Sequence, residues 1–201
     1  MADPHATPAL LTVEEWAQLD EDVEGELVDG HLEEEEVPSY AHEIVVSWLI
    51  RYLSDWLVPR GGFVLASETK LKIGPRRGRK PDLVLFFPDR PLPRRRASLG
   101  VAPPDVAIEV VTPTPRDGRR DRIEKRRDYA AAKVPQYWIV DPELRALEVY
   151  ALQPTGRYAD ALSASEGAHP VPGCEGLVLD LDALWAELDR WPDEDDSAPA
   201  D

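Results

Sequence analysis

A single glutamate in an otherwise apolar run is the feature that most constrains this sequence. The run Val106-Ala-Ile-Glu-Val-Val111 has the length of a strand, and every member except Glu109 is apolar. Such a run predicts a central strand that is buried on both faces. An ionised carboxylate left unpaired there costs several kcal/mol or more. Glu109 must therefore meet a cation, a metal ion or a dense set of hydrogen-bond donors.

A second acid stands at the start of another apolar run. Asp82 follows Pro81 and precedes the run 83–87, directly after the basic segment 74–80. Two acids at the ends of neighbouring strands, without Cys or His support, offer the hard oxygen ligands that suit Mg²⁺ or Mn²⁺ better than Zn²⁺. In the alternative interpretation, Asp82 caps a strand and Glu109 pairs with an arginine of the following helix.

Three polar residues share one face of the helix predicted over 119–132. Asp121, Lys125 and Tyr129 are spaced at i, i+4 and i+8, which places a lysine near the end of the Glu109 strand. An Asp-to-Lys step of four is also a common solubilising pair on a helix surface. The spacing alone leaves both interpretations open.

The other segments follow from periodicity and turn chemistry. Thr12 and Glu15 have the spacing of a capping box, and Asp29-Gly30 is typical of a tight hairpin. The apolar spacing of 39–58 predicts an amphipathic helix. We expect strands over 63–73, 81–87, 105–111, 136–141, 146–150 and 177–181, a loop over 74–80, and a short helix near 184–187. We expect one domain over 10–190, a flexible segment 1–9 and a disordered acidic tail 191–201.

Composition excludes several classes of protein. The apolar runs are too short for a membrane span, and no signal peptide begins the chain, so we expect a cytoplasmic protein without membrane contact. A lone Cys174 forms no internal disulfide and has no recognisable partner histidine for hydrolysis. The chain also lacks a Gly-x-Ser-x-Gly elbow, which disfavours a serine hydrolase.

The net charge of −16 hides two opposite parts of the chain. Residues 70–133 carry 18 of the 23 Lys and Arg but only 8 of the 39 Asp and Glu, so this segment is +10 and the remainder is −26. Such asymmetry is a hint of nucleic-acid contact by the basic part. The triplet Arg94 to Arg96 is also explained as a solvated loop. The candidate contacts are Arg76, Arg77, Arg79, Lys80, Arg119 and Arg120.

An ordered series of motifs resembles the Uma-two-like putative restriction endonuclease family, a branch of the PD-(D/E)XK nuclease superfamily. The resemblance covers about residues 10 to 185. The series is Gly25-Glu-Leu-Val-Asp-Gly30, His42, Pro81-Asp82-Leu-Val, Ile108-Glu109-Val-Val-Thr-Pro113, Asp121, Lys125, Tyr129 and Val134-Pro-Gln-Tyr-Trp-Ile-Val-Asp141. It implies an α/β (α+β) fold, with a restriction-endonuclease-like mixed sheet flanked by helices and an N-terminal helix and hairpin.

The resemblance also implies site residues and one departure. A divalent metal is expected at Asp82 and Glu109, with the Val110 carbonyl as a further ligand. The superfamily pattern places a lysine two residues after the second acid, where this chain has Val111. Lys125 is the implied substitute, moved from the strand to the adjacent helix.

Two further residues are auxiliary candidates with ordinary alternatives. Glu26 matches an acid that the amino-terminal part of such folds often supplies, but it is also one of ten acids between Asp20 and Glu36. His42 lies on the apolar side of its predicted helix, where a core histidine is commoner than a catalytic one. Asp121 and Tyr129 complete the auxiliary set.

The expected function is that of a Mg²⁺- or Mn²⁺-dependent endonuclease that hydrolyses phosphodiester bonds of DNA. The metal would polarise the phosphodiester and lower the pKa of a bound water, while Lys125 would stabilise the developing charge or orient the water. A duplex cutter often uses two active sites, so a homodimer is plausible. The alternative is a catalytically inactive nuclease-fold module that binds nucleic acid or a protein partner.

Overall fold

The computed structural model describes residues 10–20, 23, 25–34, 37–66, 69–100, 102–112 and 119–192. The expected flexible segment 1–9 lies outside this part of the chain, as do residues 193–201 of the expected acidic tail. Pro113, which closes one of the motifs above, also lies outside it.

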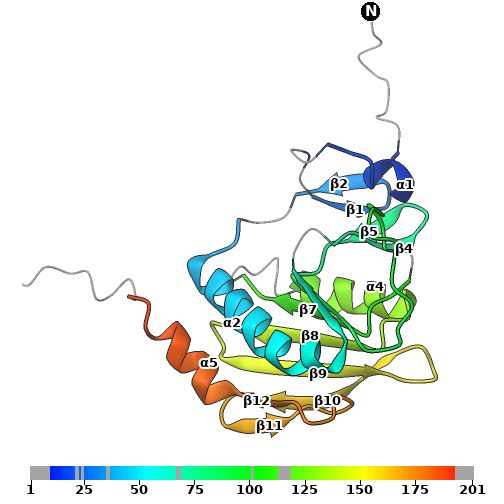
Figure 1. The fold of residues 1–201 in the computed structure, drawn as a ribbon. Coiled ribbons are helices and arrows are strands. Elements are labelled where there is room, and N and C mark those ends of the chain that lie inside the picture. The colour runs from blue at the N-terminus through cyan, green and yellow to red at the C-terminus, as the bar shows by residue number, and fades with distance from the viewer. Residues whose placement is uncertain are drawn as a thin grey trace, which may run out of the picture.

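A six-stranded mixed sheet forms the centre of the molecule (Figure 1). Its order is β10-β9-β8-β7-β6-β3. The strands are β3 (Phe63–Ala66), β6 (Leu83–Phe86), β7 (Val106–Val110), β8 (Gln136–Asp141), β9 (Ala146–Leu152) and β10 (Tyr158–Ala164). β7 pairs antiparallel with β6 and parallel with β8, and all five of its residues are buried. The prediction of a central strand around Glu109 is confirmed.

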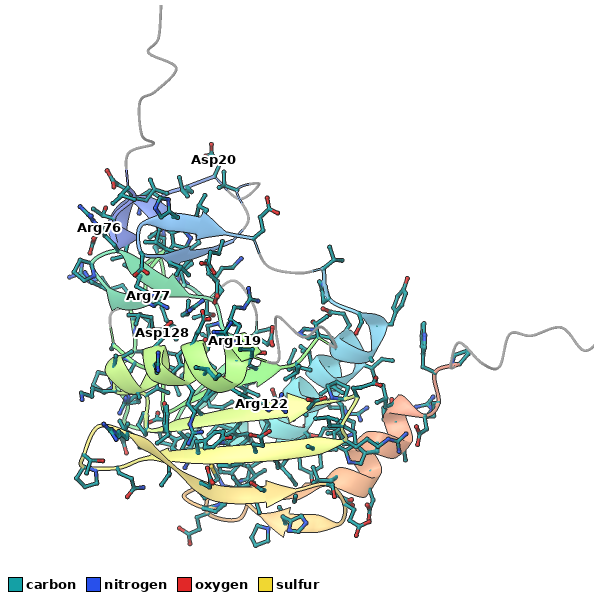
Figure 2. The ribbon with its side chains drawn as sticks, turned by 180° about the vertical axis from the view of Figure 1, so that it is seen from behind. Asp20, Arg76, Arg77, Arg119, Arg122 and Asp128 are labelled. Atoms are coloured by element: carbon teal, nitrogen blue, oxygen red, sulfur yellow. The ribbon has the colours of Figure 1, made fainter. Side chains whose placement is uncertain are left out.

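Helices cover both faces of this sheet (Figures 1 and 2). The helices α2 (Tyr40–Leu57) and α5 (Leu181–Leu188) pack on one face, where Ile108 and Val110 of β7 join their core. The π-helical turn η2 (Arg120–Lys125) continues into α4 (Arg126–Ala131) on the other face, where Ala107 packs with Tyr129. The alternation of side chains along β7 therefore sends Glu109 toward η2 and α4.

A smaller sheet carries the hairpin and the first helix. Its order is β2-β1-β5-β4, with β1 (Glu26–Val28), β2 (His31–Glu33), β4 (Leu71–Gly74) and β5 (Arg77–Arg79). Helix α1 (Val13–Trp16) begins with the predicted capping box, since the Glu15 amide donates to the Thr12 hydroxyl and the Thr12 amide donates to the Glu15 carboxylate. The ring of Trp16 lies so close to Gly78 that a Cβ there would come within 2.3 Å of it. Glycine at this position therefore lets α1 pack onto β5.

Two sequence expectations on this side are wrong. The expected single strand over 63–73 is divided between β3 of the large sheet and β4 of the small sheet. The expected loop over 74–80 contains β5, which forms a hairpin with β4. Alternation of apolar residues predicts extended backbone, but it does not show where a strand changes its partner sheet.

The carboxyl-terminal part completes the fold. A two-stranded sheet joins β11 (Ala168–Pro170) to β12 (Val178–Asp180), and α5 follows directly. A short 3-10 turn, η1 (Val58–Arg60), ends α2. β10 and β11 are absent from the sequence expectations, since neither segment has a continuous apolar run or clean alternation. Among the described helices, none is long and apolar enough to cross a bilayer.

Candidate active site

Glu109 forms the centre of the candidate site, and both of its carboxylate oxygens have a partner on the following helix. Lys125 Nζ donates to Oε2 at 2.7 Å, and the Tyr129 hydroxyl donates to Oε1 at 2.5 Å. All three side chains are buried. The predicted face with Lys125 and Tyr129 therefore points at Glu109. The partners are a lysine and a tyrosine, and not the arginine of the alternative interpretation.

Lys125 lies among three acids. Besides Glu109, its Nζ is 3.4 Å from Asp121 Oδ1 and 3.9 Å from Glu26 Oε1. Asp121 and Lys125 are both buried, so this pair is not the surface decoration that its spacing also allowed. The π-helical turn η2 contains both residues, and such wide turns are frequent at functional sites.

Asp82 lies across from Glu109, directly before the neighbouring strand β6. The β6–β7 register pairs Leu83 with Ile108, so Asp82 is one step before the pair and Glu109 one step after it. Asp82 Oδ2 accepts the Val110 amide at 2.7 Å, and His42 Nε2 lies 3.3 Å from the same oxygen. The Asp82 side chain is 22% exposed, whereas Glu109 is 2% exposed. Asp82 is therefore the acid of this pair that solvent reaches.

His42 lies at the start of α2, where its amide donates to the Ser39 hydroxyl that caps the helix. Its side chain is buried, as the core interpretation expected, but it also faces Asp82. Burial would lower the pKa of His42, but the carboxylates of Asp82 and Glu43 outweigh burial and raise that pKa above its usual value.

Glu26 belongs to a buried network of ion pairs that joins the small sheet to α4. Arg79 Nη1 donates to Glu26 Oε2 at 2.6 Å, and Arg79 Nε donates to Asp128 Oδ2 at 2.7 Å. The Lys80 amide donates to Glu26 Oε1 at 2.9 Å. Burial raises the pKa of Glu26, but Lys125 and Arg79 together lower it by more. The pKa of Glu26 therefore lies below its usual value. Glu26 therefore lies at the edge of the cluster around Glu109, and its own hydrogen-bond partners are Arg79 and the Lys80 amide.

Negative charge exceeds positive charge around Glu109. Burial, Asp82, Asp121 and Glu26 raise the pKa of Glu109 well above its usual value, and Lys125 offsets only part of this. Burial would lower the pKa of Lys125, yet the surrounding carboxylates raise it well above its usual range. Lys125 therefore stays protonated. Burial also raises the pKa of Asp121 despite Lys125 and Arg120.

The donor set fits a hard divalent cation. Asp82, Glu109 and Asp121 present carboxylate oxygens, and the buried Asp121 Oδ1 has Lys125 Nζ 3.4 Å away as an ion-pair partner but no hydrogen bond within the described chain. Each bonded oxygen of Glu109 also keeps a second lone pair. No group of three or more His, Cys, Asp or Glu in the described ranges forms a ready-made metal cage. Mg²⁺ needs no such cage, because one or two carboxylates, waters and substrate phosphates usually hold it.

The structure rearranges the expected basic surface. Arg79 is fully buried and Arg120 is nearly so, so neither side chain is available to a polyanion. Arg77 Nε donates to Asp128 Oδ1 at 2.7 Å, and Arg77 Nη1 to Asp29 Oδ1 at 3.1 Å. Lys80 is half-buried. Arg76 and Arg119 are exposed, and Figure 2 shows them on the face of α4 and the small sheet.

Sequence reasoning missed the structural role of Arg79 and the importance of Asp128. Arg79 occupies an inner strand of the small sheet, whereas the sequence placed it in a loop. The alternation Arg77-Gly-Arg79 next to Glu26 was the available signal, but it required knowing that these strands pair. A second missed cluster links Arg122 of η2 to Asp141 and Glu148, each at 2.9 Å.

Comparisons with known proteins place this arrangement in a family and a fold. A family model, Uma2, described as "Putative restriction endonuclease", matches residues 12–183. A crystal structure of a putative nuclease belonging to DUF820 from Anabaena variabilis ATCC 29413 has a TM-score of 0.69 and 21% sequence identity. This similarity covers 89% of this chain and 99% of that chain, and it shows a shared fold. No curated protein matches the sequence.

Proposed function

This chain belongs to the Uma2 family of putative restriction endonucleases, and on that basis we propose that it is a divalent-metal-dependent endonuclease that hydrolyses phosphodiester bonds of DNA in the cytoplasm. The observation that carries the proposal is the cluster around Glu109. A buried carboxylate faces a protonated lysine, stands next to Asp82 and has more negative than positive charge around it.

Mg²⁺ or Mn²⁺ is the proposed cofactor, held by Asp82, Glu109 and the Val110 carbonyl. Bound there, it would supply a Lewis acid for the phosphodiester and lower the pKa of a water. A surplus of buried carboxylate supports this assignment, because burial and the neighbouring acids raise the pKa of Glu109 and a bound cation would favour its charged form.

Lys125 is the proposed electrostatic catalyst. Its raised pKa keeps the ammonium charged, so it acts as a hydrogen-bond donor and a positive charge rather than as a base. Glu109, Asp121 and Glu26 hold this ammonium in place before substrate arrives. A preorganised charge stabilises the developing charge on a phosphoryl oxygen without reorganisation.

The remaining polar residues keep the acids in position. The Tyr129 hydroxyl stays protonated, because burial and Glu109 raise its pKa well above the usual value, and it donates to Glu109. The Val110 amide fixes Asp82 Oδ2. His42 contributes a second contact to that oxygen. For the polyanion itself, we propose Arg76 and Arg119 as the exposed contacts.

The test is cleavage of plasmid, linear duplex, single-stranded DNA and RNA with Mg²⁺ and with Mn²⁺. Lys125→Met should reduce single-turnover cleavage by about 10²-fold or more, because it removes one preorganised charge. Mn²⁺ affinity, measured by calorimetry, should fall in Glu109→Ala and remain nearly unchanged in Lys125→Met. Arg51→Ala, an exposed change on α2, is the control and should cleave like wild type.

Two outcomes would overturn the proposal. Equal Mn²⁺ affinity in wild type and Glu109→Ala would contradict the assignment of Glu109 as a metal ligand. Nucleic-acid binding with no metal-dependent cleavage of any substrate would instead support the inactive binding module.

A further inference from the structure

The π-helical turn η2 changes how residues four apart line up on this helix. In an α-helix, side chains four residues apart are offset by about 40°, so a stripe of them winds around the axis. A π-helical turn is wider, because its hydrogen bonds span five residues, and this offsets the winding over one step. Asp121 and Tyr129 therefore reach the same cluster as Lys125, whose Nζ lies 3.4 Å from Asp121 Oδ1 and 2.7 Å from Glu109 Oε2. The wide turn thus contributes to the position of Lys125.

The wide turn also redirects backbone hydrogen bonds. In an α-helix, the Lys125 amide would donate to the Asp121 carbonyl, four residues before it. In a π-helical turn such as η2, an amide reaches one residue further back along the chain. The Asp121 carbonyl accepts instead from a side chain on the sheet, the Tyr137 hydroxyl of β8, at 3.1 Å. Tyr137 therefore supplies the donor that the α-helical form would take from Lys125.

Packing fixes the ring of Tyr137, but packing does not require its hydroxyl. The side chain is fully buried in the core on the α4 face of the large sheet. The centroid of its ring lies 5.0, 6.0 and 6.2 Å from those of Tyr129, Tyr158 and Tyr150. A phenylalanine would fill the same space. A buried hydroxyl costs free energy unless it is hydrogen-bonded, and the Asp121 carbonyl is the acceptor of this one.

We propose that Tyr137 is a positioning residue, whose hydroxyl holds η2 in its π-helical form and thereby keeps Lys125 at Glu109. Burial and the acids Asp121 and Glu109 raise the pKa of Tyr137 well above its usual value, so the hydroxyl keeps the proton that it donates. The effect of Tyr137 on cleavage rests on the proposed function. Its effect on the position of Lys125 does not.

Acylation of lysines tests the position of Lys125 without any cleavage assay. Lys125 is 5% exposed and ion-paired, so an N-hydroxysuccinimide ester should acylate it slowly in wild type. In Tyr137→Phe, the acylation rate of Lys125, followed by peptide mass spectrometry, should rise about 5-fold. This factor corresponds to the loss of one hydrogen bond of about 1 kcal/mol. Tyr158→Phe is the matched control, because it removes a hydroxyl that donates to the Val134 carbonyl at 2.8 Å, and it should leave the rate unchanged.

Single-turnover cleavage provides a second measurement. Tyr137→Phe should reduce cleavage by about 10-fold or more, because a misplacement of about 1 Å can cost 10²-fold in rate. Mn²⁺ affinity should remain nearly unchanged. In a Lys125→Met background, Tyr137→Phe should cause no further loss of cleavage, since residues that act as a unit are not additive. A role in overall stability alone would add its own loss to that of Lys125→Met.

Three results would overturn the proposal. The first is an unchanged acylation rate of Lys125 in Tyr137→Phe. The second is an equal rise in Tyr158→Phe, since the loss of either hydroxyl would then loosen the helix. The third is an additive loss of cleavage in the double variant. A wild type that cleaves no substrate would contradict the proposed function alone, and the acylation rates would still decide the role of Tyr137.

Discussion

Glu109 shows how one buried charge organises its surroundings. Its carboxylate accepts from Lys125 and Tyr129, and Glu109 lies across from Asp82, the residue just before β6. Lys125 offsets part of the cost, but burial and the neighbouring acids together keep the charged form unfavourable. A residue with such an environment is suited to bind a cation, because the bound state removes the repulsion.

The free energy of unfolding of the metal-free protein should therefore depend on pH through the ionisation of Glu109. Its pKa is raised in the folded state, so the folded protein holds a proton that the unfolded chain has released. Glu109 contributes its full stabilisation below pH 4.5, which is its usual pKa. This contribution declines as the pH rises through the raised pKa of the folded state. Glu109→Gln, which cannot ionise, should gain stability relative to wild type over that window. Urea unfolding at several pH values in a chelator measures this difference.

With Mn²⁺ present, wild type should become more stable than Glu109→Gln. A ligand that binds the folded state stabilises it, and Gln is a poorer metal ligand than Glu. Glutamine can accept from Lys125 and donate to the Tyr129 hydroxyl, so the variant keeps both contacts of Glu109 in altered form. A loss of more than ~2 kcal/mol in metal-free Glu109→Gln would instead indicate that Glu109 serves a structural ion pair.

The sequence predicted these residues well where their spacing is local. Asp121, Lys125 and Tyr129 lie on one helix face, and their periodicity was enough to place them near Glu109. Arg79 could not be placed in this way, because its partners Glu26 and Asp128 lie 53 and 49 residues away. Pairing over such separations depends on the fold, and a single sequence does not reveal it.

At the scale of elements, the ion-pair network through Arg79 is the main polar link between the small sheet and α4. β5 supplies Arg79, β1 supplies Glu26 and α4 supplies Asp128, and all three side chains are buried. The sequence predicted α2, β6, β7 and β8 at nearly their observed bounds, because long periodic segments have clear signals. It did not predict that the chain leaves the large sheet after β3, since nothing local in 63–73 marks the change of partner.

Arg79→Met should destabilise the fold by about 3–5 kcal/mol, because it leaves Glu26 and Asp128 buried with fewer partners. Lys72→Met is the control on the neighbouring strand β4. Lys72 is 35% exposed and pairs with Glu14, which is 60% exposed, so its loss should be about 1 kcal/mol or less. Urea unfolding compares the two. Equal losses would mean that the buried network adds no more than a surface pair.

In the whole molecule, ion pairs neutralise much of the charge asymmetry between segments of the sequence. Acids from the rest of the chain pair with bases of the segment 70–133, as in Lys72 with Glu14, Arg77 with Asp29 and Arg79 with Glu26. Others pair inside the segment, as Lys125 does with Glu109. An excess of Lys and Arg in a segment is therefore a weak guide to a positive surface. Of the six basic residues predicted to contact nucleic acid, mainly Arg76 and Arg119 remain exposed.

Salt dependence of DNA binding tests that smaller surface. Measured without divalent metal, so that DNA stays intact, Arg76→Ala and Arg119→Ala should each weaken binding to all sequences alike. Each should reduce the slope of log K against log salt by about 0.9, the value for one phosphate contact in duplex DNA. Arg51→Ala changes an exposed residue of α2, which packs on the other face of the large sheet from α4, and should leave the slope unchanged. Unchanged slopes in all three variants would place the DNA elsewhere.

The long separation between the members of the site has a consequence during synthesis. Glu26 leaves the ribosome first, while its neighbour Lys125 and the Tyr129 that holds Glu109 come about a hundred residues later. β7 also lacks its parallel neighbour β8 until residue 141 has emerged. A growing or truncated chain thus carries the acids without the lysine. An activity that depends on Lys125 would therefore appear only in chains in which β7, β8 and the helix that carries Lys125 have all been made.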